Sequence, residues 1–188
     1  MLPDMRRAKA PISWPLAGPY GHPYHPALVP IPIGAWIASM IFDISSHFVS
    51  KPAFLSAGSE WLIAIGIIGA IIAGLAGVMD LTSLAEGTRT YRTAFAHMIL
   101  NMFLIVLYGG DFWWRQHTYA SGAPVGAGAM SLSACCLVLL TVSGFLGGRL
   151  AYRYGVRVAD EATQASGYLT HGERGSRRRG ELREQPPH

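Results

Sequence analysis

Four apolar stretches, separated by short polar segments, dominate the pattern of hydrophobic and polar positions along the chain. They cover residues 30–49, 61–81, 93–112 and 129–150. Each is close to the ~20 residues that an α-helix needs to cross the ~30 Å hydrocarbon core of a bilayer. The pattern therefore predicts an all-α integral membrane protein, a four-helix bundle whose transmembrane domain occupies residues 21–158.

Prolines and polar residues set the two flanks of this domain apart. Residues 1–20 are a Pro-rich N-terminal segment, and Pro23, Pro26, Pro30 and Pro32 follow it. Because proline suits only the first turn of a helix, residues 21–31 are expected to form an irregular lead-in to the first span. Residues 159–188 are polar and poor in bulky apolar side chains, which predicts a disordered basic tail.

The second apolar stretch is rich in small residues at four-residue spacing. Gly66, Ala70 and Gly74 form one such series, and Ala73 with Gly77 forms another. Small residues let helix backbones approach closely within a membrane. We therefore expect this helix to be the central packing element, with Gly74 and Gly77 against another helix. A groove for a cofactor is the alternative interpretation.

Composition and charge support the membrane class and fix an orientation. The chain of 188 residues is 51% hydrophobic and 14% charged, against roughly 25% charged residues in soluble domains. Thirteen of its 15 Lys and Arg residues lie on the side of the termini, and only Lys51 and Arg115 lie on the other side. This asymmetry predicts cytoplasmic N- and C-termini. The net charge of +4 matches anionic lipid headgroups, so no nucleic-acid partner is predicted. The adjacent Cys135 and Cys136 are expected to pack in the core.

Polar side chains gather at one predicted depth on the cytoplasmic side. They are His22 and His25 in the lead-in, Asp80 at the end of the second span, and His97 with Asn101 in the third. Ionisable residues within a membrane indicate a functional site by default. Two ligand sets follow. His25 and His97 would be axial ligands of a haem b, with Asp80 and Asn101 as supporting partners. Alternatively, His22, His25, Asp80 and His97 would hold a metal ion.

Structural interpretations of the same residues remain open. Asp80 ends a helix, where the macrodipole disfavours negative charge, so it is expected to pair with Arg89 or Arg92. His97 and Asn101 would then only hydrogen-bond a neighbouring helix. Asp43 and His47 lie four residues apart near the other end of the first span, and they form either a proton relay or a helix-capping pair.

Four motifs occur in order and carry a resemblance to a known family. They are HPALVPIPIG with a following FD, GLAGVMD, HMILN, and GGRLAYRYGVRV, over residues 22–158. Together they resemble the bacterial membrane family called "domain of unknown function 2231". The likeness places His25, Pro26, Asp43, Asp80, His97, Asn101 and Gly148 on the characteristic positions of that family. It implies a four-helix bundle in the bacterial inner membrane. The family has no established activity, but its members are sometimes fused to or encoded beside Rieske-type or cytochrome-type proteins, which implies a redox partner protein.

Three functions follow from these observations. The leading hypothesis is a redox-associated membrane domain that binds a haem or a metal ion at the cytoplasmic-side His and Asp cluster. The alternatives are a structural or assembly subunit, in which the polar cluster only packs, and a small proton or ion transport component. Beyond the bilayer and a redox partner, a homodimer would supply the further spans that transport requires. The motifs GxSxG, HExxH and the P-loop are absent, so no enzymatic activity is predicted.

Overall fold

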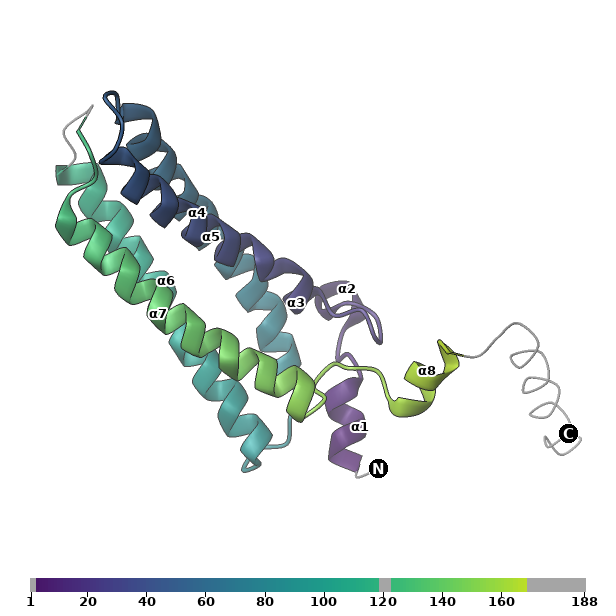
Figure 1. Cartoon of the computed structure of the whole chain (residues 1–188). Coiled ribbons are helices and arrows are strands. Elements are labelled where there is room, and N and C mark those ends of the chain that lie inside the picture. The colour runs from purple at the N-terminus through teal and green to yellow at the C-terminus, as the bar shows by residue number, and fades with distance from the viewer. Residues whose placement is uncertain (1–2, 119–122, 169–188) are drawn as a thin grey trace, which may run out of the picture. The chain divides into compact units, whose positions relative to one another are not determined.

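The computed structural model describes residues 3–118 and 123–168, which are helical apart from short connections (Figure 1). The helices are α1 (Pro3–Lys9), α2 (Trp14–Ala17), α3 (Tyr24–Leu28), α4 (Pro30–Ser46), α5 (Ala53–Leu81), α6 (Arg89–Thr118), α7 (Ala127–Gly148), a π-helical turn η1 (Arg149–Arg153) and α8 (Glu161–Ser166). The chain divides after Arg157 into two units. The first contains the helical bundle, and the second contains α8.

Four of these segments are long and apolar enough to cross a membrane. They are Tyr24–Ser46, Ala53–Leu81, Arg89–Thr118 and Ala127–Arg153. The predicted fold class, an all-α membrane bundle of four helices, is confirmed. The third helix extends beyond its predicted apolar stretch of residues 93–112 at both ends, since it covers Arg89–Thr118. Apolar side chains such as Ile68 and Leu75 are exposed on the outer surface, where lipid would cover them.

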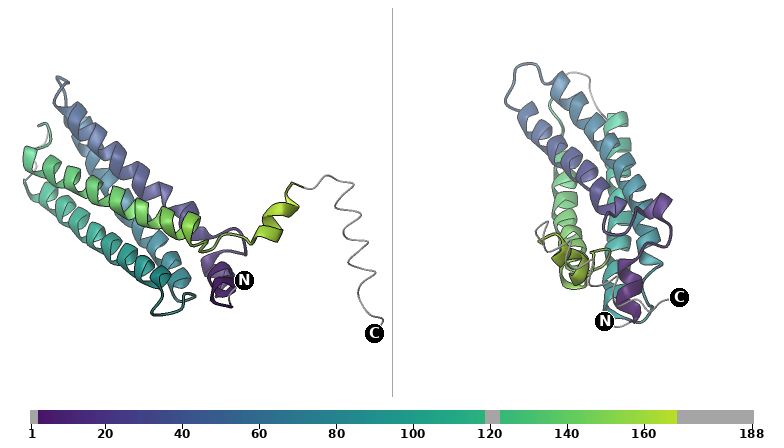
Figure 2. Two further views of the ribbon diagram at one scale, coloured as in Figure 1. Left: turned by 60° about the horizontal axis from the view of Figure 1, so that its bottom comes forward. Right: turned by 90° about the vertical axis from the view of Figure 1, so that its right-hand side faces the viewer.

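The bundle is built from antiparallel neighbours (Figures 1 and 2). α4 packs on α5, α5 on α6 and α6 on α7, and α4 also contacts α7. We call the end where α4 and α6 begin the entry end, and the end where they finish the far end. The short helix α3 lies at the entry end against α5.

The inward face of each helix repeats in steps of three or four residues, which is the spacing of one helical face. On α6 this face carries Ala94, His97, Asn101, Leu104, Tyr108, Asp111 and Arg115. On α4 the corresponding buried residues are Pro32, Trp36, Ser39, Asp43 and Ser46. The bundle therefore has a polar layer near each end and an apolar layer between them.

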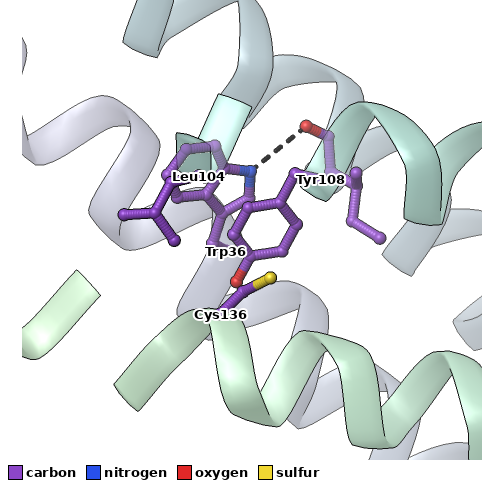
Figure 3. Packing of buried hydrophobic residues seen from close by; sticks show 5 residues of the cluster. Trp36, Leu104, Tyr108 and Cys136 are labelled. Atoms are coloured by element: carbon purple, nitrogen blue, oxygen red, sulfur yellow. Dashed lines mark hydrogen bonds between the residues drawn. The ribbon is translucent and has the colours of Figure 1, made fainter. Parts of the chain in front are cut away.

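An aromatic stack fills the apolar layer (Figure 3). The rings of Trp36 and Tyr108 are 4.1 Å apart and nearly parallel. The indole N–H of Trp36 donates to the carbonyl oxygen of Ile63 at 3.3 Å. Leu104 and Cys136 complete the cluster. Cys136 packs in the core as predicted, whereas Cys135 is exposed, so the prediction holds for only one of the two cysteines.

The small residues of α5 make room for side chains of α3 and α4. A Cβ atom at Gly66 would collide with the Trp36 indole, and one at Gly77 would lie 3.0 Å from the imidazole of His25. Gly74 has nothing within 4 Å of its Cβ position. The expectation that Gly74 packs against another helix is therefore wrong. Gly74 lies one residue beyond the inward-facing Ala73, which turns it to the outside of the bundle.

The N-terminal segment is folded against the entry end. Ala8 of α1 packs with Leu84 and Ala94. Arg157, whose side chain is 3% exposed, donates through Nη2 to the carbonyl oxygens of Ala17 and Gly18, both at 2.8 Å. Its backbone N–H donates to the carbonyl oxygen of Ala8. One arginine thus ties this segment to the chain that follows α7.

The predicted disordered tail lies mostly outside the described residues. Its described part contains α8, so it is not wholly irregular. The Asp160 carboxylate caps this helix by accepting a hydrogen bond from the Thr163 N–H at 2.7 Å.

Candidate functional site

The polar layer at the entry end brings His25 and His97 together. His25 comes from α3 and His97 from the third turn of α6, and their ring centroids are 6.1 Å apart at 85°. The proline before α3 and the start of α4 at Pro30 place the His25 side chain toward α5. Both imidazoles are partly buried.

Each imidazole contacts a backbone carbonyl of a neighbouring helix, which is α5 for His25 and α7 for His97. His25 Nδ1 lies 2.7 Å from the carbonyl oxygen of Ala73, and His97 Nδ1 lies 2.9 Å from that of Ser143. Because a carbonyl oxygen can only accept, both Nδ1 atoms carry the hydrogen. A neutral imidazole in this tautomer keeps a lone pair on Nε2. The arrangement therefore presents two Nε2 atoms as potential ligand atoms, and that of His97 also lies 3.3 Å from the amide nitrogen of Asn101.

Glycines on the facing helices support the two rings. Gly77 lies beneath His25, and a Cβ atom at Gly147 would lie 3.2 Å from the His97 ring. Asn101 secures His97 from the next turn of α6, since its amide nitrogen donates to the His97 carbonyl and to the Ser143 hydroxyl, both at 2.7 Å. The entry-end pair is thus fixed by four helices.

Asp80 lies near this pair but has another partner than expected. Its carboxylate forms an ion pair with Arg157 Nε at 2.8 Å, and not with Arg89 or Arg92, whose residues are exposed. The predicted need for a cation at this helix end is met, but by an arginine 77 residues further along the chain. Arg157 reaches it because the backbone turns sharply there, with Arg157 at φ 59°.

The four side chains considered as metal ligands are not gathered. His22 is exposed, and its nearest polar partner is the carbonyl oxygen of Tyr20 at 3.4 Å. Within residues 3–118 and 123–168 no group of three or more His, Cys, Asp and Glu side chains is placed to hold a metal ion. His25 and His97 are therefore the two imidazoles that the structure brings together.

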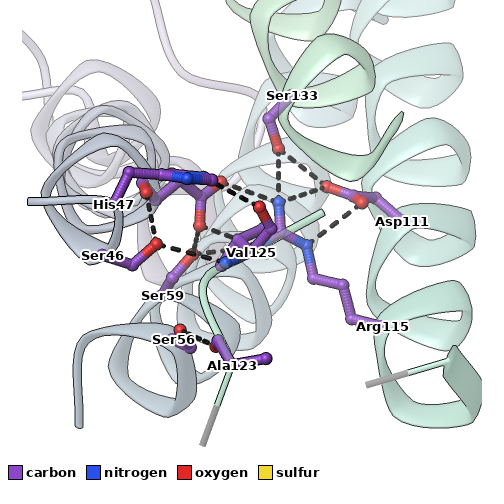
Figure 4. A network of polar contacts seen from close by, with 10 residues as sticks. Ser46, His47, Ser56, Ser59, Asp111, Arg115, Ala123, Val125 and Ser133 are labelled. Atoms are coloured by element: carbon purple, nitrogen blue, oxygen red, sulfur yellow. Dashed lines mark hydrogen bonds and ion pairs between the residues drawn. The ribbon is translucent and has the colours of Figure 1, made fainter. Parts of the chain in front are cut away.

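The polar layer at the far end is a closed ionic network (Figure 4). Arg115 donates from Nη1 and Nη2 to the two oxygens of Asp43, both at 2.8 Å. It also donates from Nε to Asp111 Oδ1 at 3.1 Å. The hydroxyl of Ser59 donates to Asp43, and that of Ser133 donates to Asp111 at 2.7 Å. All five side chains are buried.

Asp43 and His47 are directed to different partners. The Asp43 carboxylate faces Arg115, whereas His47 Nε2 lies 2.9 Å from the carbonyl oxygen of Val125, which precedes α7. Ser46 accepts from the Val125 N–H at 3.1 Å. His47 thus fastens the α6–α7 connection to the end of α4.

Asp111 and Arg115 were not predicted as site residues from the sequence, where Arg115 was noted only as a basic residue on the side opposite the termini. The signal that would have found them is the continuation of one helical face. Steps of three and four residues lead from His97 and Asn101 to Asp111 and Arg115.

Comparison with known proteins gives one family. The family described as "Predicted membrane protein (DUF2231)" matches residues 21–160. No curated protein and no solved structure matches the chain significantly.

Proposed function

The chain belongs to this family of predicted membrane proteins, and we propose that it is a redox-associated membrane domain that binds a haem between His25 and His97. The observation that carries the proposal is the facing pair of imidazoles, each with its Nδ1 atom held by a backbone carbonyl. Histidines that bind metals usually donate their second ring N–H to such an acceptor, which fixes the tautomer and the ring orientation.

The donor set favours a haem over a bare metal ion. A protein-bound zinc ion takes at least three protein ligands, and no group of three is present among the described residues. A haem supplies four ligands of its own and needs only two axial groups from the protein. The ring centroids of the two imidazoles are 6.1 Å apart, so the two residues are close enough to hold one group between them.

The surroundings of the pair support the same assignment. Asn101 and Ser143 fix His97, so they would act as positioning residues. The Asp80–Arg157 ion pair lies at the same end of α5 and brings a partly buried charge pair near the proposed centre. Such groups tune the reduction potential of a haem. Electrons would be exchanged with a redox partner protein at the entry end.

A structural or assembly subunit is the second candidate. It is favoured by the hydrogen bonds that link His97, Asn101 and Ser143 across α6 and α7, because a packing cluster would form the same links. In that case the two imidazoles would only join helices.

An absorption spectrum separates these candidates. We expect the full-length protein, purified from membranes, to show the reduced-minus-oxidised spectrum of a six-coordinate b-type haem, with iron in equal amount to protein. His97→Ala should lose this spectrum while the protein remains folded in detergent.

His117→Ala is the matched control. His117 lies on the same helix, is exposed, and is bonded to the carbonyl oxygen of Trp113 on its own helix. It should keep the wild-type spectrum. A wild-type protein without chromophore or metal would contradict the proposal and leave the structural subunit. If the wild-type protein is colourless but contains a metal that His97→Ala loses, the ligand of this site is a metal ion and not a haem.

A further inference from the structure

The far-end network carries one more negative charge than positive charge. Two carboxylates, Asp43 and Asp111, face one guanidinium, Arg115, and the three side chains are 0%, 0% and 3% exposed. Burying an unbalanced charge inside a membrane bundle is costly, so the group usually neutralises instead. A charge of +1 is therefore needed at this site.

The donors of Arg115 lead to the same conclusion. A guanidinium has five N–H bonds, but the structure shows six acceptors within reach. Nε faces Asp111, and Nη1 faces Asp43 and Ser59. Nη2, which has two hydrogens, faces three acceptors, namely Asp43 at 2.8 Å, Ser133 at 3.0 Å and Asp111 Oδ2 at 3.2 Å. Two of these three contacts must therefore share one hydrogen, and the contact to Asp111 Oδ2 is the longest of the three.

We propose that the far-end network is a proton-binding site and that the proton resides on Oδ2 of Asp111. The proton comes from water and forms an O–H bond that donates to the Ser133 hydroxyl oxygen, 2.7 Å away. The hydroxyl hydrogen of Ser133 then turns away from Asp111. Asp43 remains the carboxylate that pairs with Arg115, because both of its oxygens lie at 2.8 Å from the guanidinium. The site is separate from the His25–His97 pair and does not depend on a haem there.

Other titratable groups near the network do not replace this proton. Tyr108 on α6 and Cys136 on α7 are neutral when protonated. Glu60 on α5 adds only negative charge and accepts a hydrogen bond from Gln116 at the rim. Among the described residues, His47 at the C-terminal end of α4 is a neighbour that could supply a positive charge, and its Nε2 is engaged with the carbonyl oxygen of Val125.

Two buried hydroxyls extend the polar interior from the network toward the entry end. Ser39 lies one turn before Asp43 on α4, and Tyr108 lies one turn before Asp111 on α6. Both residues are fully buried, and neither hydroxyl has a hydrogen-bond partner among the described residues. Buried hydroxyls are normally paired, so unpaired ones at a site need an explanation. Each offers the free donor and acceptor capacity that a proton moving to or from Asp111 requires.

Infrared spectroscopy of the full-length protein in lipid nanodiscs tests the proposal. We expect the wild type at neutral pH to show the C=O stretch of a buried, protonated carboxyl group. The stretch should be lost in Asp111→Asn and retained in His47→Gln and in the control Glu60→Gln. A wild-type spectrum without this stretch, or a stretch that survives Asp111→Asn, would overturn the proposal.

Thermal unfolding provides a second measurement on the same variants. Asparagine resembles a protonated aspartate, so Asp111→Asn should melt at the wild-type temperature or above it. Asp43→Asn removes the short ion pair, and its melting temperature should fall by about 5 °C. The reverse order of stability would place the proton on Asp43 and refute the assignment to Asp111.

Discussion

The Arg115 side chain links α4 to α6 at the far end of the bundle through its bonds to Asp43 and Asp111. Replacing it by methionine keeps an unbranched side chain but leaves the Asp43 carboxylate buried without a cation. Removing one partner of a buried ion pair typically costs about 3–5 kcal/mol. We therefore expect Arg115→Met to lower the free energy of unfolding by about that amount, measured by thermal unfolding in detergent.

Arg153→Met is the control for this substitution. Arg153 is exposed at the end of η1, so its loss should change the stability by less than about 0.5 kcal/mol. Equal effects of the two substitutions would mean that the network contributes no more than a surface charge.

At this scale the sequence shows which residues are polar within the spans but not which partners they meet. Asp43 was recognised, yet its partner Arg115 lies 72 residues away on another helix. Asp80 was expected to pair with a nearby arginine, and its partner lies beyond α7. Ion pairs between helices depend on the rotation of both helices about their axes, and local spacing does not contain that information.

Helix α5 offers a matched pair of glycines for testing how the elements pack. Gly66 lies directly against the Trp36 indole, whereas Gly74 faces open space on the outer side. Overpacking a close contact costs about 1–3 kcal/mol, and more where the neighbour cannot move. Gly66→Leu should lower the melting temperature clearly, and Gly74→Leu should leave it near the wild-type value. A greater loss from Gly74→Leu would mean that this face of α5 meets a partner.

Arg157 connects the N-terminal segment to the bundle, and its loss should release α1 and α2. The Arg157→Ala variant lacks the two bonds to the Ala17 and Gly18 carbonyls and the ion pair with Asp80. We expect trypsin to cleave after Arg6 or Lys9 roughly tenfold faster, since a loss of about 1.4 kcal/mol changes an equilibrium tenfold. Tyr152 is fully exposed and lies five residues before Arg157, so trypsin should cleave the Tyr152→Ala variant at the wild-type rate.

Among the elements, the four long helices were predictable and the short ones were not. Hydropathy locates a span because the length of apolar chain is set by the bilayer. The π-helical turn at Arg149–Arg153 and the turn at Arg157 have no such signal. Leu150 of the first packs against the cluster of Ala8, Leu84 and Ala94, and Arg157 bonds to α1, α2 and α5. The extension of α6 beyond residue 112 was not predicted, because the charged residue that it contains, Arg115, is paired inside the bundle.

The topology of the whole molecule gives a prediction that does not depend on either site. Thirteen of the 15 basic residues lie on the side of the two termini. Reporter fusions at Gly122 and at Gly180 should therefore report opposite compartments, with Gly180 in the cytoplasm. The same compartment for both fusions would refute a bundle of four spans.

The inward face of α6 limits how the length of this helix can change. One residue inserted between Asn101 and Tyr108 would rotate everything beyond it by about 100°, which would carry Asp111 and Arg115 from the interior toward lipid. Seven inserted residues would nearly restore the rotation, but they would lift these side chains by about 10 Å past Asp43 on α4. Rotation and height together thus fix the number of residues between His97 and Asp111. Insertions and deletions should be tolerated in the connections between helices and not in this segment of α6.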